Sequence, residues 1–190
     1  MSKPKPGQKV KLISSLFSSD VGLIMKVIKQ MEKYFGVTDW ISEEIIFDRT
    51  KYYAKEMGWP LYRRFISFEK HIYPEFLVEA KLITNKIEDE HLSNMKRKIN
   101  IDPGYISLER LVLATGKNYI HRIYLGKGIY ADLTLVFRAG TFKSLEWTYP
   151  DYKNEKTIDC FNTLRDNYLS YLRGKKNEVE VFKREGQHYA

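Results

Sequence analysis

Two short turns constrain the second half of this chain more than any other feature of the sequence. Gly126-Lys127-Gly128 and Ala139-Gly140 divide residues 119–147 into three segments in which apolar and polar residues alternate. Alternation with a period of two is typical of half-buried β-strands, and turns of two or three residues join antiparallel neighbours. The sequence therefore predicts an antiparallel β-meander with strands over 119–125, 129–138 and 141–147.

The first half predicts strands that alternate with amphipathic helices. Val10–Phe17 is typical of a buried strand, and residues 21–35 place apolar side chains at spacings of three and four before Gly36. The further elements expected are strands over 41–47, 61–68 and 98–102, a short helical turn from Thr50 to Met57, and a helix from Pro74 to Ile87. This order is the split βαβ, or ferredoxin-like, arrangement.

The remaining segments complete an α+β prediction: a ferredoxin-like βαββαβ core extended by an antiparallel β-meander, with a C-terminal helix. Residues 108–115 fit a strand or a Ser-capped helix ended by Gly116, and both alternatives stay open. A last helix is expected over about 155–173. We expect residues 1–9 to form a flexible N-terminal arm, residues 10–173 a single domain, and residues 174–190 a charged, mobile tail.

The formal net charge of +8 lies mostly at the two ends of the chain. Residues 1–11 hold four lysines and no acid, whereas residues 12–172 carry 23 basic and 21 acidic side chains. Proteins that bind the phosphate backbone concentrate positive charge on the folded body, so nucleic-acid binding is not favoured. Residues 127–131 are faintly similar to the aromatic signature of RNA-recognition modules, but Ile129 stands at an aromatic position.

Other classes lack their characteristic motifs. Cys160 is the only cysteine, which excludes an intrachain disulfide and favours a reducing, cytoplasmic location. No segment approaches the roughly 18 apolar residues of a membrane span, so no membrane association is predicted. The four histidines have no partners at metal-ligand spacing, and no nucleophile elbow or phosphate-binding loop occurs. The sequence assigns neither catalytic residues nor a cofactor.

The predicted register of the hairpins gathers polar and aromatic side chains on one face. Pairing across the first turn places Arg122 opposite Asp132 and Tyr124 opposite Tyr130. Pairing across the second turn adds Trp147 and Tyr149 to the same rows. The opposite face, which also receives His121, is expected to be the core side and carries Ile123, Leu125, Ile129, Ala131, Leu133, Leu135 and Phe137.

Neighbouring segments add further groups to this candidate site. Asp102-Pro103-Gly104-Tyr105 predicts a type II turn, with Asn100 and Asp102 on one side of the preceding strand. Arg63 and Arg64 point to opposite sides of their strand, so one of them could face the site, and the sequence does not say which. The candidate ligand-binding residues are Asn100, Asp102, Tyr105, Arg122, Tyr124, Lys127, Tyr130, Asp132, Trp147 and Tyr149.

These groups suit a small, ring-bearing and anionic molecule such as a nucleotide. Aromatic rings stack on flat ligands, and an arginine beside a carboxylate orients an anion. The same cross-strand pairs would also stabilise a sheet that binds nothing. An alternative function is a protein-interaction or self-association module in which the aromatic face docks a partner or a second copy. Single-stranded RNA binding is the third alternative.

Seven short segments carry a resemblance to a known family. They are Phe47 through Thr50-Lys51-Tyr52-Tyr53 to Glu56-Met57-Gly58, Arg64-Phe65 with Ser67-Phe68, Thr84-Asn85, Asn100-Ile101-Asp102-Pro103-Gly104-Tyr105, His121-Arg122-Ile123-Tyr124-Leu125-Gly126, Gly128-Ile129-Tyr130-Ala131 and Trp147-Thr148-Tyr149-Pro150-Asp151-Tyr152. Together they span roughly residues 10–172 and resemble the bacterial and archaeal family catalogued as domain of unknown function 4416. The resemblance implies a compact single-domain protein without an established activity.

Overall fold

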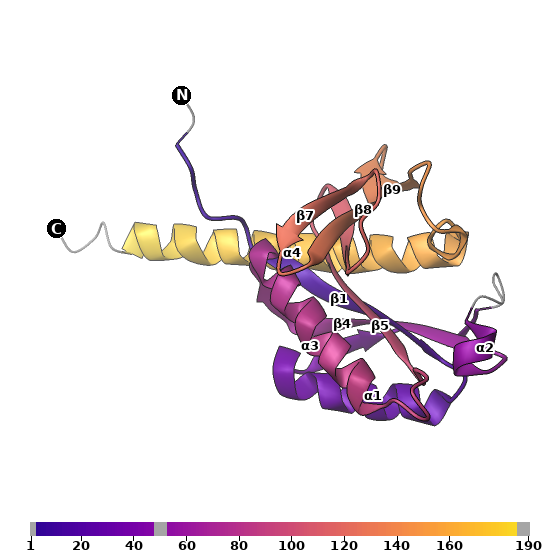
Figure 1. Ribbon diagram of the computed structural model, residues 1–190. Coiled ribbons are helices and arrows are strands. Elements are labelled where there is room, and N and C mark those ends of the chain that lie inside the picture. The colour runs from indigo at the N-terminus through magenta and orange to yellow at the C-terminus, as the bar shows by residue number, and fades with distance from the viewer. Residues whose placement is uncertain (1–2, 48–52, 186–190) are drawn as a thin grey trace.

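The computed structural model describes residues 3–47 and 53–185, with side chains described up to residue 174. It is an α+β structure built on one antiparallel sheet, whose strands follow the order β2-β4-β1-β5-β6-β8-β7 (Figure 1). β3 lies beside β4, and β9 lies beside β8. The strands are β1 (Val10–Ser18), β2 (Thr38–Ile41), β3 (Ile45–Ile46), β4 (Tyr62–Ile72), β5 (Asn100–Ile106), β6 (Arg110–Thr115), β7 (Arg122–Gly126), β8 (Ile129–Arg138) and β9 (Thr141–Ser144).

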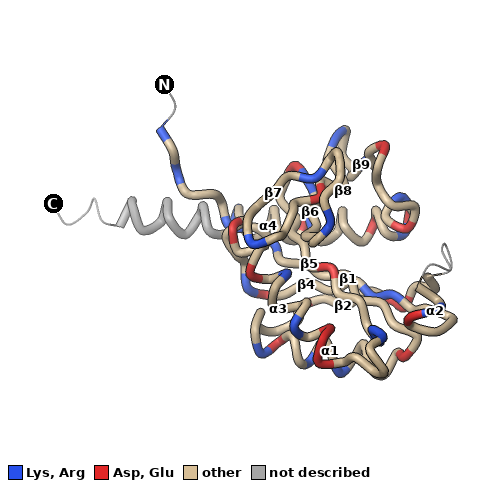
Figure 2. Tube along the Cα trace, viewed as in Figure 1, with Lys and Arg blue, Asp and Glu red and all other residues tan. Residues whose placement is uncertain are grey.

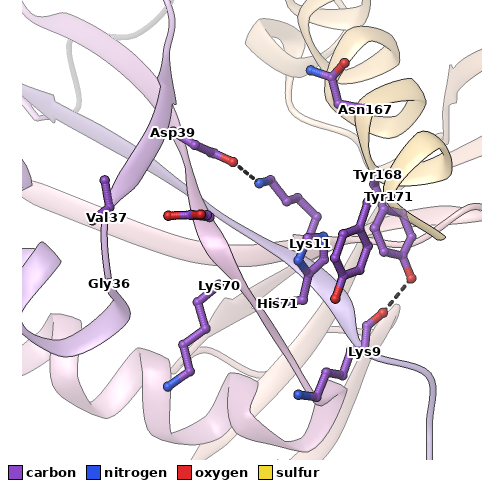
Figure 3. A pocket seen from close by; sticks show the side chains of 11 residues that line it. Lys9, Lys11, Gly36, Val37, Asp39, Lys70, His71, Asn167, Tyr168 and Tyr171 are labelled. Atoms are coloured by element: carbon purple, nitrogen blue, oxygen red, sulfur yellow. Dashed lines mark hydrogen bonds and ion pairs between the residues drawn. The ribbon is translucent and has the colours of Figure 1, made fainter. Parts of the chain in front are cut away.

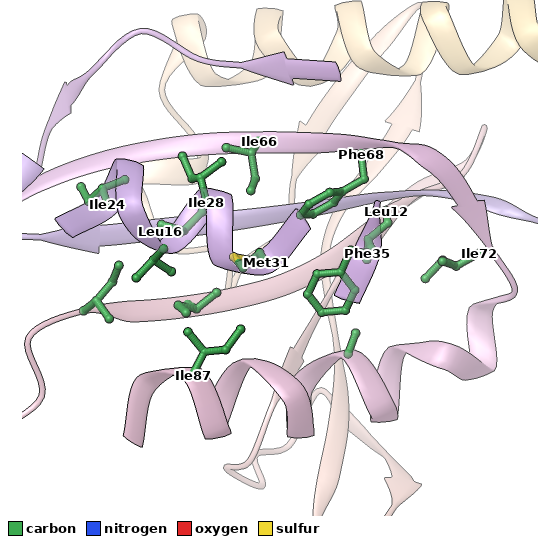
Figure 4. Packing of buried hydrophobic residues seen from close by; sticks show 14 of the residues in the cluster. Leu12, Leu16, Ile24, Ile28, Met31, Phe35, Ile66, Phe68, Ile72 and Ile87 are labelled. Atoms are coloured by element: carbon green, nitrogen blue, oxygen red, sulfur yellow. The ribbon is translucent and has the colours of Figure 1, made fainter. Parts of the chain in front are cut away.

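Two helices, α1 (Val21–Phe35) and α3 (Leu77–Glu90), cover one face of the first four strands of that order, and we call it the α1/α3 face. Alternate residues of β1 and β4 point into this layer, where they pack against apolar side chains of both helices (Figure 4). The predicted helix over 21–35 is confirmed, because Asp20 accepts a hydrogen bond from the N–H of Leu23 at 3.0 Å and Gly36 ends the helix at φ 89°.

The opposite face is covered by α4 (Glu155–Glu185) and the short helix η2 (Pro150–Tyr152), and we call it the α4 face. Phe161 and Leu164 of α4 pack there against Ile13 and Phe65 of the sheet. The predicted C-terminal helix is present, but its predicted end at Arg173 is wrong. A glycine inside a helix costs only about 1 kcal/mol, so Gly174 does not stop a helix that is anchored by packing. Residues 186–190 lie outside the described residues.

β5 corrects the prediction of a turn at residues 102–105. The chain continues as a strand through Pro103 and Gly104, with β1 on one side and β6 on the other. A Cβ atom on Gly104 would lie 2.5 Å from the carbonyl oxygen of Val112, so glycine is required for the close approach of β6 rather than for a turn. The open alternative for residues 108–115 resolves as strand β6.

β8 is the central strand of the second half, and this changes the expected meander. The β7–β8 and β8–β9 hairpins form, but β6 pairs with β8 instead of β7. A central strand buries both faces, and β8 does so with Ile129, Asp132 and Leu135, whereas Ile123 of β7 is exposed. The strand is ten residues long, so β7 and β9 can follow one another along its other edge.

A β-bulge in β8 overturns the prediction of one apolar face from residue 123 to residue 137. Val112 pairs with Leu133 and Leu111 with Leu135, so Thr134 has no opposite residue in β6. The extra residue reverses the alternation. Ala131 and Leu133 therefore pack toward α3, whereas Leu135 packs toward α4.

Smaller differences concern residues 41–57 and the start of α3. The predicted strand over 41–47 is divided into β2 and β3 by a segment in which the Ser42 hydroxyl accepts a hydrogen bond from the N–H of Phe65 at 2.9 Å. A short helix, α2 (Ala54–Met57), follows, but the proposed cap Thr50 lies outside the described residues. A 3-10 turn, η1 (Pro74–Phe76), precedes α3. Basic and acidic side chains are interspersed over the described body (Figure 2).

Candidate functional site

Asp132 is the centre of a buried group of polar side chains on the α4 face. Its carboxylate accepts hydrogen bonds from Arg122 Nε at 2.8 Å and from Thr134 Oγ1 at 3.3 Å, and it contacts His121 Nε2 at 3.3 Å. Asp132 is only 6% exposed. Burial alone would lower the pKa of Arg122, but its hydrogen bonds to Asp132 and Tyr149 raise that pKa overall. We call His121, Arg122, Asp132, Thr134, Trp147 and Tyr149 the Asp132 cluster.

The segment after β9 completes this cluster by a route that the register does not predict. β9 ends at Ser144, so Trp147 does not pair with Asp132 across a strand ladder. Trp147 and Thr148 instead donate side-chain hydrogen bonds to the β8 carbonyl oxygens of Leu133 and Thr134, at 2.8 and 2.6 Å. These two side chains therefore take the place of a strand at the bulge, between the ends of β7 and β9.

His121 is the member of the cluster that the sequence argument places on the wrong side. The residue lies just before β7, where strand alternation does not yet apply. Its ring stacks on Trp147 at a centroid distance of 4.8 Å and an interplanar angle of 9°. A residue at the end of a turn can point to either face of the sheet. The sequence signal that His121 could join the cluster is therefore only its position next to Arg122.

Arg63 and Asp151 form a second buried ion pair on the α4 face. The Arg63 guanidinium lies 4.3 Å from the ring centroid of Phe47 and 5.6 Å from that of Tyr152. Burial lowers the pKa of Arg63, and burial also raises the pKa of Tyr152 to about 12. The pair anchors η2 on the sheet. Arg64 points away and donates to the carbonyl oxygen of Ser42 at 2.8 Å.

Asn100 and Asp102 belong to a separate network at the free edge of β5. Asn100 Nδ2 donates to Asp102 Oδ2 at 2.8 Å, and Arg97 joins Asn100 to Glu56 of α2. Lys81 and Glu88 of α3 bind the carbonyl oxygen and the N–H of Ile101, at 2.7 and 2.5 Å. These contacts satisfy backbone groups that have no neighbouring strand, because β6 pairs only from Gly104 onward.

The other predicted site residues lie apart from the Asp132 carboxylate. Tyr105 packs between the sheet and α3. Tyr124 and Tyr130 pair with a centroid distance of 5.1 Å, one row beyond Arg122 on the same face. Lys127 lies at the tip of the hairpin, where it forms an exposed ion pair with Glu79 at 3.3 Å. The structure thus brings Arg122, Asp132, Trp147 and Tyr149 together and leaves the carboxylate enclosed by protein partners.

A cavity beside the start of β1 and the end of β4 is a second candidate ligand-binding site (Figure 3). It has a volume of about 620 Å³ and lies between the sheet, α4 and the end of α1. We call it the lysine cavity, and it is lined by Lys9, Lys11, Gly36, Val37, Asp39, Glu69, Lys70, His71, Asn167, Tyr168 and Tyr171. Ligand sites in proteins commonly enclose about 300–1,000 Å³.

The three lysines that line the lysine cavity differ in burial. Lys11 is buried, forms an ion pair with Asp39 and donates to the carbonyl oxygen of Phe68 at 2.8 Å. Lys9 and Lys70 are exposed, and their side chains lie at one end of the cavity (Figure 3). Glu69 is the remaining acid in the lining. The cavity can therefore offer two ammonium groups to an anion without breaking the buried pair.

Aromatic side chains form the opposite wall and connect to a second hollow. The His71 ring stacks on Tyr171 with a centroid distance of 3.8 Å, and the Tyr168 hydroxyl donates to the carbonyl oxygen of Lys9 at 2.5 Å. A neighbouring cavity of about 430 Å³ shares Lys9, Lys70 and His71 and adds apolar surface from Tyr34, Phe35, Ile72 and Phe76. Glu75 and Glu79 also line it.

The sequence gives only weak signals for the lysine cavity. Lys9 and Lys11 fall in the region of basic residues at the start of the chain, and no sequence motif marks His71. The lining comes from β1, β4, α4 and the residues around Gly36, which are far apart in the chain. Their proximity depends on β4 pairing with β1, which the predicted ferredoxin-like arrangement implies, and on α4 crossing the sheet, which no local pattern predicts.

In the described part of the chain, no helix is both long and apolar enough to cross a membrane. Within residues 3–47 and 53–185, no three histidine, cysteine or acidic side chains lie together in a way that could hold a metal ion.

Comparison with known proteins identifies the family. Neither the curated proteins nor the solved structures gave a match to this sequence. A family model described as a domain of unknown function, DUF4416, matches residues 8–168, which include β1 to β9 and most of the packed part of α4. The chain therefore belongs to the DUF4416 family.

Proposed function

We propose that this protein binds a small anionic ligand in the lysine cavity, on the α4 face of its sheet. The observation that carries the proposal is a hollow of about 620 Å³ with two exposed ammonium groups, Lys9 and Lys70, at one end. A nearly neutral folded body that gathers exposed lysines beside a cavity offers a local site for an anion rather than a long basic track.

The neighbouring hollow indicates what the rest of the ligand is like. Its apolar wall of Phe35, Ile72 and Phe76 adjoins the two lysines, so a molecule with its anionic group at Lys9 and Lys70 could extend an apolar or aromatic body over this wall. The acids Glu75 and Glu79 disfavour a second anionic group there, and Glu79 is partly neutralised by Lys127. A phosphate or carboxylate attached to a ring fits these features.

The Asp132 cluster is the less favourable place for the same ligand. Its carboxylate and guanidinium are buried and bind one another, so a ligand would have to displace an existing ion pair. Trp147 and Tyr149 remain partly exposed and could stack with a ring, so this cluster is the alternative binding site.

We also infer that residues 10–106 form a ferredoxin-like unit. The order β2-β4-β1-β5, with α1 and α3 on one face, supports this inference, since that topology places the first and third strands of a βαββαβ unit at the centre. A cytoplasmic location is part of the proposal too. It is supported by Cys160, the single cysteine of the chain.

A thermal-shift screen of the full chain tests the proposed function. The probes are inorganic phosphate, pyrophosphate, nucleoside mono-, di- and triphosphates, and aromatic carboxylates. We expect at least one of these anions to raise the melting temperature, less so at high salt because the two lysines are exposed. A screen in which none of these anions stabilises the chain would contradict the proposal.

Matched lysine variants then locate the binding site of the strongest probe. The Lys9→Gln/Lys70→Gln double variant should bind at least about tenfold more weakly, a loss of about 1.4 kcal/mol. Lys26→Gln, which removes a charge from an exposed position on α1, should bind as the wild type does. Because Lys9, Lys26 and Lys70 are all exposed, each variant should keep its melting temperature.

A further inference from the structure

The lining of the lysine cavity carries charges of both signs, and they lie at different ends. Lys9 and Lys70 lie at one end, and the carboxylate of Asp39 lies at the other (Figure 3). Glu69 is the second acid of the lining, and its side chain is exposed. Among the residues that the structure describes, Glu69 forms no ion pair, although three lysines line the same cavity. The cavity therefore presents positive and negative groups that do not all neutralise one another.

A β-bulge in β2 holds the Asp39 carboxylate in the cavity. The register between β2 and β4 shifts between Thr38 and Trp40, so Asp39 is the extra residue. Bulges commonly redirect a side chain, and here Asp39 accepts a hydrogen bond from Ser67 Oγ at 2.6 Å and forms the ion pair with Lys11. The Asp39 side chain is still 35% exposed, so its oxygens can accept a further hydrogen bond from a ligand.

The end of α1 adds negative potential beside Glu69. The last carbonyl groups of a helix act as about half a negative charge, and α1 ends next to Gly36, which lines the cavity. The N–H of Glu69 donates to the carbonyl oxygen of Val37 at 2.9 Å, which fixes Glu69 near this helix end. An ammonium group is therefore favoured near Glu69, whereas an anionic group is favoured near Lys9 and Lys70.

We propose that the ligand of the lysine cavity is a phosphate monoester that also carries an ammonium group, a class of ligand that rests on the proposed function of anion binding there. Lys11 compensates the charge of Asp39. Glu69 is then the remaining acid of the lining, opposed by the exposed ammonium groups of Lys9 and Lys70. A phosphate monoester carries nearly two negative charges at neutral pH. One such group and one ammonium group complement this lining in both charge and arrangement.

Isothermal titration calorimetry of the full chain with matched probes tests this proposal. Tyramine O-phosphate and 4-ethylphenyl phosphate differ only in the amino group, and so do O-phosphoethanolamine and ethyl phosphate. We expect the amine-bearing member of at least one pair to bind at least about tenfold more tightly than its partner. Phenylalanine, which carries an ammonium group and a carboxylate but no phosphate, should bind more weakly than that phosphate.

The Glu69→Gln variant assigns the ammonium group to its place in the cavity. It should bind the amine-bearing phosphate at least about tenfold more weakly. It should bind the amine-free phosphate as tightly as the wild type or more tightly, because a negative charge near the anion is removed. Glu43→Gln, at an exposed acid outside the lining, should keep the wild-type preference. Both variants should keep their melting temperature, since both side chains are exposed.

The outcomes separate this proposal from the proposed function. If both members of each pair bind equally, and binding still depends on Lys9 and Lys70, the amine is not recognised and anion binding stands. A preference for the amine that persists in Glu69→Gln, or phenylalanine binding more tightly than every phosphate, would overturn the proposal as well. If neither phosphates nor carboxylates bind, both the proposal and the proposed function are wrong.

Discussion

At the scale of single residues, burial decides what the polar side chains of the sheet do. Arg122 and Asp132 look in the sequence like groups on an open face, yet their side chains, like that of His121, are more than nine-tenths buried. A buried charge is tolerated when it is paired and hydrogen-bonded. The Asp132 cluster accordingly holds the bulge of β8, the start of β7 and the segment after β9 together.

Asp132→Asn should therefore destabilise the fold more than an exposed ion pair would allow. The amide cannot neutralise Arg122, and loss of one partner of a buried pair costs about 3 kcal/mol or more. For a chain of this size, that corresponds to a fall of about 10 °C in melting temperature. Calorimetry checks this, with Asp89→Asn on the exposed side of α3 as the control. A fall of less than about 3 °C would show that the pair is dispensable.

Arg63 and Asp151 give a second test at this scale. Arg63→Met leaves a mostly buried carboxylate without its cation, and Asp151→Asn leaves a guanidinium among aromatic rings without its anion. Each single variant should be destabilised by about 3 kcal/mol, and the double variant by clearly less than the sum. Urea denaturation of the four proteins measures this coupling. Simple additivity would mean that η2 is held without the ion pair.

At the scale of elements, the free edge of β5 depends on two side chains of α3. Glu88 accepts the N–H of Ile101, and burial raises the pKa of Glu88 from its ordinary value of 4.5 to about 7. Between these two pH values the folded chain binds more protons than the unfolded chain does. The free energy of unfolding should therefore fall as the pH rises from about 5 to 8, by about 3 kcal/mol from this residue.

Denaturation of Glu88→Gln at several pH values checks the assignment. The amide cannot ionise, so this contribution to the pH dependence should disappear, whereas Glu43→Gln at an exposed position should keep it. An unchanged slope between pH 5 and 8 in Glu88→Gln would assign the pH dependence to another group.

The junction between β5 and β6 depends on a single glycine. A methyl group on Gly104 would lie 2.5 Å from the Val112 oxygen and 2.7 Å from Leu113 Cδ2, so the two strands would have to separate. Gly104→Ala should cost about 2–3 kcal/mol. Gly116→Ala, whose new methyl group meets nothing within 4 Å, should be nearly neutral. Equal melting temperatures for the two variants would contradict this account of β5.

The elements also show which features the sequence could predict. The helix over 21–35 and the Arg122–Asp132 pairing follow from local periodicity and turn length, and both are present. The bulge at Thr134 and the pairing of β6 with β8 depend on contacts between distant segments, so alternation within β8 could not predict them. Pro103-Gly104 is a turn signal in most sequences, but here β1 and β6 hold this dipeptide in a strand.

At the scale of the whole molecule, the two faces of the sheet have different roles. The α1/α3 face is filled by apolar side chains, whereas the α4 face combines an apolar centre with the Asp132 cluster on one side and the lysine cavity on the other. The candidate residues in the sequence lead to the first of these polar regions. The cavity appears only once α4 crosses the sheet and β1 lies beside β4 (Figure 1).

The measurement that tests the central claim most directly is an NMR titration of the ¹⁵N-labelled chain with the strongest anion from the thermal-shift screen. The lysine cavity predicts that the backbone amides of Lys9, Val37, Lys70 and His71 shift with a common saturation curve, while those of Arg122, Asp132 and Tyr149 stay in place. Shifts confined to the Asp132 cluster, with the cavity amides unmoved, would contradict the account.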